Sequence, residues 1–85
     1  SLPIQIKISI DFDVRVLVQN NKGKDTLDTV LTAQELNDKQ TIKIPTNFDI
    51  GRYYLSINPT DEDKEEIMGV IRRVIFKNKD LIPTE

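Results

Sequence analysis

The first eighteen residues carry the feature that most limits how this chain can fold, because an apolar side chain stands at every second position from residue 4 onward. The apolar positions are Ile4, Ile6, Ile8, Ile10, Phe12, Val14, Val16 and Val18. Apart from Leu17, the residues between them are polar. This period of two is typical of a β-strand with one face buried. Since one strand over 4–18 would extend about 50 Å, too far for a small domain, we expect a bend or bulge near 11–13 and two strands.

Turn residues divide the rest of the chain into further short strands. Asn and Gly residues gather over 20–24, and both accept the positive φ of a tight hairpin. The return strand is therefore expected over 26–31. Two more strands are predicted just before the prolines at 45 and 59, which cannot donate a ladder hydrogen bond; they cover 41–44 and 52–57.

One short helical turn is predicted between these strands. Thr32 and Glu35 have the spacing of a capping box. Asn37 and Asp38 then follow, and we expect them to end the turn before a full helix forms.

The segment 60–79 fits two patterns. As a helix it has Thr60 as N-cap, acidic residues in its first turns and basic residues in its last turns. Gly69 disfavours a helix, and the residues from Val70 to Phe76 are rich in β-branched and aromatic types. The composition favours a strand preceded by a long acidic turn, with a helix as the alternative.

These elements predict one all-β domain over residues 1–85. Several short alternating segments separated by turns are typical of an immunoglobulin-like antiparallel β-sandwich, here of about 6–7 short strands. The alternative is an α+β fold with a C-terminal helix at 60–78. Unpaired strands at the sheet edges make a dimer a further expectation.

Composition argues against several functions. Histidine and cysteine are absent, so the commonest general base and the thiol nucleophile are missing and we expect no enzyme and no cofactor. The carboxylates at 61, 63 and 65 do not match a calcium loop, and no metal site is predicted. A net charge of -2 does not favour nucleic acid. No segment is apolar enough to insert into a membrane, no signal segment is recognised, and the compartment is left open.

Three sequence segments resemble known bacterial domains. They are LPIQIKI at 2–8, VLVQNNKG at 16–23 and GRYYLSI at 51–57. The amino-acid sequences of these segments resemble the C-terminal carbohydrate-recognising domains of the ATPase subunits that export O-antigen polysaccharides. They are also similar to small immunoglobulin-like domains of bacterial surface proteins.

The resemblance implies a non-catalytic module that binds a glycan, or alternatively a structural or adhesion domain of a larger secreted or surface protein that contacts other proteins. For glycan binding the candidate residues are Arg52, Tyr54 and Arg73. Tyr54 would stack on a sugar, and the arginines would donate hydrogen bonds to hydroxyl or acidic groups. A second interpretation places Tyr53 in the core and Tyr54 on an outer face, where it simply covers the sheet.

Overall fold

The computed structural model describes residues 3–77, of which 51% are in strands and 19% in helices, so the chain is mostly β as expected. The six strands are β1 (Ile4–Lys7), β2 (Val14–Asn20), β3 (Asp25–Leu31), β4 (Thr41–Ile44), β5 (Gly51–Pro59) and β6 (Ile71–Lys77). The helical segments are α1 (Ala33–Lys39), the 3-10 turn η1 (Glu62–Lys64) and α2 (Glu65–Met68).

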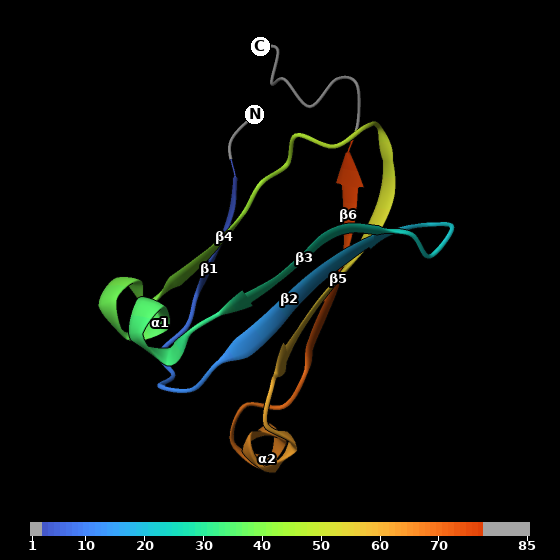
Figure 1. Ribbon diagram of the computed structural model, residues 1–85. Coiled ribbons are helices and arrows are strands. Elements are labelled where there is room, and N and C mark those ends of the chain that lie inside the picture. The colour runs from blue at the N-terminus through green and yellow to red at the C-terminus, as the bar shows by residue number, and fades with distance from the viewer. Residues whose placement is uncertain (1–2, 78–85) are drawn as a thin grey trace.

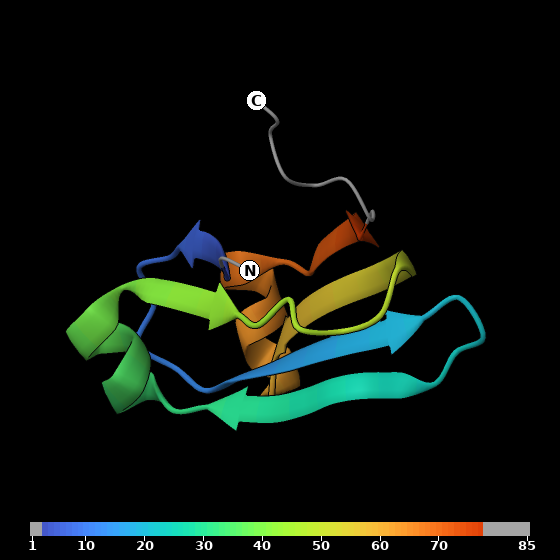
Figure 2. The ribbon, with the colours of Figure 1, turned by 90° about the horizontal axis from the view of Figure 1, so that it is seen from above.

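The strands form two antiparallel sheets. One is a pair, β1 and β4, and the other has four strands in the order β3-β2-β5-β6. The two-stranded sheet lies over one face of the larger sheet (Figures 1 and 2). One face of the larger sheet is therefore covered, and its opposite face is not covered by the other sheet.

The alternating segment at the start of the chain forms two strands, as predicted. β1 pairs with β4 and β2 pairs with β3 and β5, so the same pattern supplies one strand to each sheet. The break covers 8–13, which is wider than the predicted 11–13. At its end the Asp13 carboxylate accepts a hydrogen bond from the Ala33 backbone N–H at 2.8 Å, which fixes the start of α1 beside the start of β2.

The predicted hairpin at 20–24 is confirmed. Asn20 Oδ1 accepts hydrogen bonds from the backbone N–H groups of Lys22 and Lys24, both at 2.9 Å. Gly23 has φ 81°, a left-handed conformation that glycine adopts without a steric penalty. The β2–β3 register shifts between Val18 and Gln19, so this ribbon carries a bulge close to its turn.

Helix α1 is longer than predicted. Its capping box is present, with Thr32 and Glu35 bonded reciprocally. The predicted end at Asn37 and Asp38 is wrong, because the helix continues to Lys39 and ends on Gln40 in the left-handed region with φ 53°. Leu36 explains the difference: it is 1% exposed, and burying a leucine contributes about 1.5–3 kcal/mol, enough to outweigh the weak helix propensity of Asn and Asp.

The segment 60–77 contains short helical turns over 62–68, followed by a strand over 71–77. The favoured strand is confirmed as β6, and the alternative of a continuous helix over 60–78 is wrong. Position 78 lies outside the described residues. The acidic part contains η1 and α2 and ends at Gly69 with φ 74°, where the chain leaves the helical region and enters β6.

A single cluster of apolar side chains fills the space between the sheets. Val14, Val16 and Val18 of β2 are each at most 1% exposed. No polar or charged residue among residues 3–77 is buried. The buried members of this cluster are Ile6, Val14, Val16, Val18, Leu36, Ile42, Ile44, Tyr53, Leu55 and Ile57.

Candidate functional site

The uncovered face of the four-stranded sheet is the candidate functional site, and we call it the outer face. Strand alternation and register define it, because residues paired across an antiparallel sheet point to the same side. Tyr54 pairs with Gln19 on β2 and with Val74 on β6. Ser56 pairs with Leu17 and with Arg72. Two rows of side chains therefore cross the sheet on the side away from the core.

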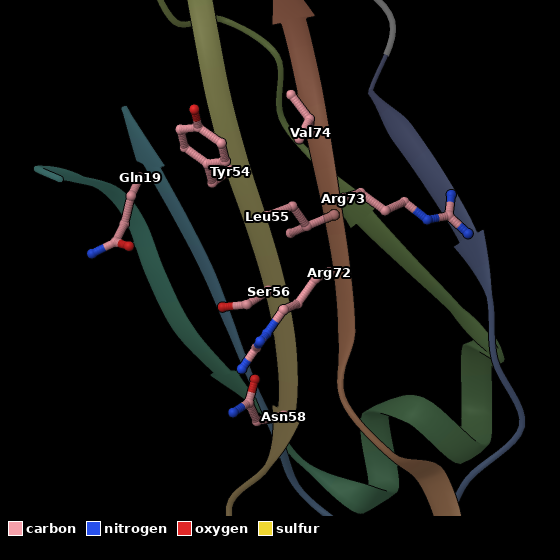
Figure 3. Close-up of a pocket in the computed structure, with 8 residues that line it drawn as sticks. All are labelled: Gln19, Tyr54, Leu55, Ser56, Asn58, Arg72, Arg73 and Val74. Carbon is pink, nitrogen blue, oxygen red and sulfur yellow. The ribbon is translucent and has the colours of Figure 1, made fainter. Parts of the chain in front are cut away.

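A shallow hollow lies on this face. Its volume is about 400 Å³, and it is open to solvent. Its walls come from β2, β5 and β6, and Figure 3 shows its lining residues. They are Gln19, Tyr54, Leu55, Ser56, Asn58, Arg72, Arg73 and Val74. We call this feature the outer hollow.

The two adjacent tyrosines lie on opposite faces of β5. Tyr53 is 6% exposed and belongs to the core. Its ring centroid is 4.2 Å from that of Phe48, and its hydroxyl donates a hydrogen bond to the Asp49 carbonyl at 2.8 Å. Tyr54 is 41% exposed, and its ring stands beside the outer hollow (Figure 3). The placement of Tyr53 in the core and Tyr54 on the outer face is thus confirmed.

Arg52 shares the outer face with Tyr54. It lies two residues before Tyr54 on β5, and its register partner on β6 is Phe76. The Arg52 guanidinium carbon lies 5.3 Å from the centroid of the Phe76 ring, within the range of a cation–π contact. Phe76 is 56% and Val74 52% exposed. The outer face therefore continues past the outer hollow as a partly apolar surface.

Arg73 does not join the other two candidate residues. It pairs with Leu55, which is a core residue, so its side chain leaves β6 on the covered side of the sheet. Figure 3 shows it directed away from Tyr54. The neighbouring Arg72, which pairs with Ser56, lies on the outer face instead. Arg52 and Tyr54 thus share the outer face, and the β6 arginine on this face is Arg72 and not Arg73.

Carboxylates on β3 are held by polar groups of β2 on the same face. Arg15 donates from Nε and Nη2 to both oxygens of Asp28, at 2.8 and 2.6 Å. This hydrogen bonding lowers the pKa of the Asp28 carboxyl and raises the pKa of Arg15. Gln19 Nε2 donates to Asp25 Oδ1 at 2.9 Å. Both acidic groups therefore have partners, and neither lines the outer hollow.

A second hollow lies beside the two-stranded sheet. Its volume is about 380 Å³, and Lys7 and Lys39 line it with Ile8, Ser9, Gln40 and Thr41. No aromatic ring is among these residues. This second hollow offers positive charge but no aromatic surface that would orient a ligand. The outer hollow combines an aromatic ring with amide, hydroxyl and guanidinium groups, and it is therefore the better candidate for a binding site.

Residues 3–77 lack both a cluster of metal ligands and a membrane-spanning helix. No group of three or more metal-ligating side chains comes together there. No helix in that range is long and apolar enough to cross a membrane.

Sequence reasoning missed most of the outer hollow. The β5 residues Ser56 and Asn58 could have been found, because they continue the alternation that begins at Arg52 and Tyr54. Gln19 and Arg72 could not, since their neighbours across the sheet depend on strand register. Phe76 also required the register of β6.

Comparison of the chain with known protein families, with curated proteins and with solved structures finds no match.

Proposed function

We propose that this chain is an immunoglobulin-like β-sandwich that acts as a non-catalytic binding module and holds an extended glycan on its outer face. The two antiparallel sheets around one core support the fold part of the proposal. The binding part depends on the side chains that the larger sheet turns away from that core.

The observation that carries the proposal is the half-exposed ring of Tyr54 among neutral polar side chains. Gln19, Ser56 and Asn58 line the outer hollow with it, and Gln19 offers its carbonyl oxygen because its amide nitrogen already donates to Asp25 and to the Gly23 carbonyl. An aromatic face suits the apolar C–H face of a sugar, while amides and hydroxyls exchange hydrogen bonds with sugar hydroxyls. Such a mixture of one stacking surface and several hydrogen-bonding groups is what a glycan site requires.

The shape of the outer face suits an extended ligand. The outer hollow is open, and the surface continues through Val74 to the Arg52–Phe76 pair. A small substrate would remain largely in water here, whereas enzyme sites usually enclose most of their ligand. The shifted pKa values of Arg15, Asp28 and Glu35 come from an ion pair and a helix cap, which are structural arrangements. The proposal therefore includes binding and no reaction.

Binding to immobilised bacterial polysaccharides, followed by titration calorimetry with the best oligosaccharide, tests this function. We expect Tyr54→Ala to weaken binding about tenfold, equivalent to about 1.4 kcal/mol, because the stacking surface is lost. Ile67→Ala is the matched control, since Ile67 is 68% exposed on α2 and does not line the outer hollow. Absence of binding at millimolar sugar, or equal binding by Tyr54→Ala, would contradict the proposal.

A structural or adhesion domain of a larger secreted or surface protein is the second candidate. Val74 and Phe76, both more than half exposed, favour it because they lie on β6 at the edge of the larger sheet. Apolar side chains beside an unpaired edge strand suit contact with another protein or a second copy of the chain. Sedimentation velocity over a range of concentrations tests self-association. A dimer that Phe76→Lys disperses would support this candidate, and a monomer at all concentrations would leave only contact with a different protein.

A further inference from the structure

We infer that the ligand of the outer face is an acidic glycan and that Arg72 binds its carboxylate. The inference rests on the proposed function, because it specifies which class of glycan the outer hollow accepts.

The residues that line the outer hollow include two arginines and no acidic group, although the chain carries a net charge of -2. Strands β5 and β6 contain no Asp or Glu. Their outward residues include Arg52 and Arg72, while the acidic groups of β3 on the same face, Asp25 and Asp28, already accept hydrogen bonds from Gln19 and Arg15. A local excess of positive charge attracts an anion even when the protein as a whole is acidic.

Arg15 and Arg72 both lie on the outer face, but only Arg15 forms an ion pair with a residue of the described chain. Arg15 binds both oxygens of the Asp28 carboxylate, with N–O distances of 2.8 and 2.6 Å. Arg72 makes no ion pair with any of residues 3–77. Its planar group offers the same donor fork as Arg15, and this fork matches a carboxylate. The Arg15–Asp28 pair thus shows how an arginine of this face binds a carboxylate. Arg72 is available to bind a carboxylate of a ligand in the same way.

The position of Arg72 relative to Tyr54 fits a sugar acid. Arg72 lies opposite Ser56, so it is diagonal to Tyr54 across neighbouring strands, a separation of about 7–8 Å between backbones. Figure 3 shows the Arg72 side chain running past Ser56 toward Asn58, so that its guanidinium lies at the end of the outer hollow away from the Tyr54 ring. A sugar ring stacked on Tyr54 would therefore leave the carboxylate of a neighbouring unit, lying over Ser56 and Asn58, to meet Arg72.

The neutral groups of the outer hollow distinguish a sugar acid from an anion in general. Inorganic phosphate would contact Arg72 without using the Tyr54 ring. An acidic peptide would bring carboxylates but no array of hydroxyls for Gln19, Ser56 and Asn58. A uronic-acid polysaccharide supplies the carboxylate, the apolar ring face and the hydroxyls together.

The experiment compares acidic bacterial polysaccharides with their own carboxyl-reduced forms, in which each uronic acid has become the neutral sugar. Neutral polysaccharides and poly-glutamate complete the panel. We expect the whole chain to bind the acidic form about tenfold more tightly than the reduced form, with a smaller preference at high salt, where charges are screened. Poly-glutamate should bind no better than the reduced polysaccharide.

Two variants test the assignment to Arg72. Arg72→Gln removes the charge and should abolish the preference while neutral binding remains. Lys43→Gln also removes a positive charge, from an exposed residue of β4 that does not line the outer hollow, and should preserve the preference. Thermal unfolding followed by circular dichroism confirms that both variants are folded.

Each remaining outcome has a defined meaning. Equal binding of acidic and reduced forms would overturn the acidic-glycan inference and leave the proposed function standing. A preference that survives Arg72→Gln, or that Lys43→Gln removes equally, would overturn the role of Arg72. If poly-glutamate bound as tightly as the acidic polysaccharide, the outer face would bind anions in general, and the acidic-glycan inference would be overturned. Binding of no polysaccharide at all would refute the proposed function itself.

Discussion

The two faces of the four-stranded sheet are built from the same strands and have opposite properties. On the covered face Val16, Leu55 and Ile57 are at most 2% exposed, and none of the polar side chains among residues 3–77 is buried with them. On the outer face Arg15, Tyr54 and other polar or half-exposed residues stand between those core positions. Adjacent residues of one strand therefore differ in role: one packs in the core and the next lies on the outer face. Substitutions one position apart should have different effects on the free energy of unfolding and on binding.

The largest effect is expected from truncating a core residue of β5. Leu55→Ala and Ile57→Ala should each lower the free energy of unfolding by about 2–5 kcal/mol, because each leaves a cavity in the shared core. Ser56→Ala, between them on the outer face, should change it by less than about 0.5 kcal/mol. Urea unfolding followed by circular dichroism measures all three. Similar losses at 55 and 56 would break the distinction between the faces.

The adjacent tyrosines allow a finer comparison with a single chemical change. Tyr53→Phe removes the hydrogen bond to the Asp49 carbonyl and should lower the free energy of unfolding by about 1 kcal/mol. Tyr54→Phe should leave stability unchanged, since Tyr54 is exposed. Chemical unfolding of the two variants side by side is the measurement. A greater loss for Tyr54→Phe would show that the outer face is buried in solution.

Acid sensitivity should arise from the surface and not from the core, which holds no charged group. The pKa of Asp28 is lowered by its hydrogen bond from Arg15, and that of Glu35 by hydrogen bonds from the Thr32 backbone and side chain. Each carboxylate thus stabilises the fold above its ordinary pKa, near pH 4, and this contribution disappears as the pH falls through the lowered value. The free energy of unfolding should therefore decrease as the pH falls below about 4.

Asp28→Asn and Glu35→Gln each remove one of these titrating groups. Each variant should be slightly less stable than the parent chain at neutral pH, and its stability should depend less on pH below about pH 4. Thermal unfolding between neutral and acidic pH measures both effects. An unchanged pH dependence in both variants would show that neither carboxylate contributes to acid sensitivity.

The sequence predicted those parts of the fold that depend on local pattern. Alternation placed Tyr53, Leu55 and Ile57 on one face of β5, and Asn and Gly residues placed the hairpin. The length of α1 could not be predicted, because the burial of Leu36 depends on strands distant in sequence. Composition favoured β6 as a strand without giving its register.

The candidate site depends on that missing register. The connection from Pro59 to Ile71 contains short helical turns and a left-handed Gly69, and its geometry decides which β6 residue lies opposite Ser56. A shift of one residue reverses the face of every side chain in a strand. Without the register, Arg73 was predicted in the site, whereas Arg72 is the β6 arginine on the outer face.

NMR titration of the chain with an acidic oligosaccharide shows which strands the ligand contacts. Perturbed amide signals should concentrate in β2, β5 and β6 around Gln19, Ser56 and Arg72, and the ring signals of Tyr54 should move most among the aromatic groups. Perturbations confined to the two-stranded sheet around Lys7 and Lys39, or none at millimolar sugar, would show that the outer face is not the glycan site.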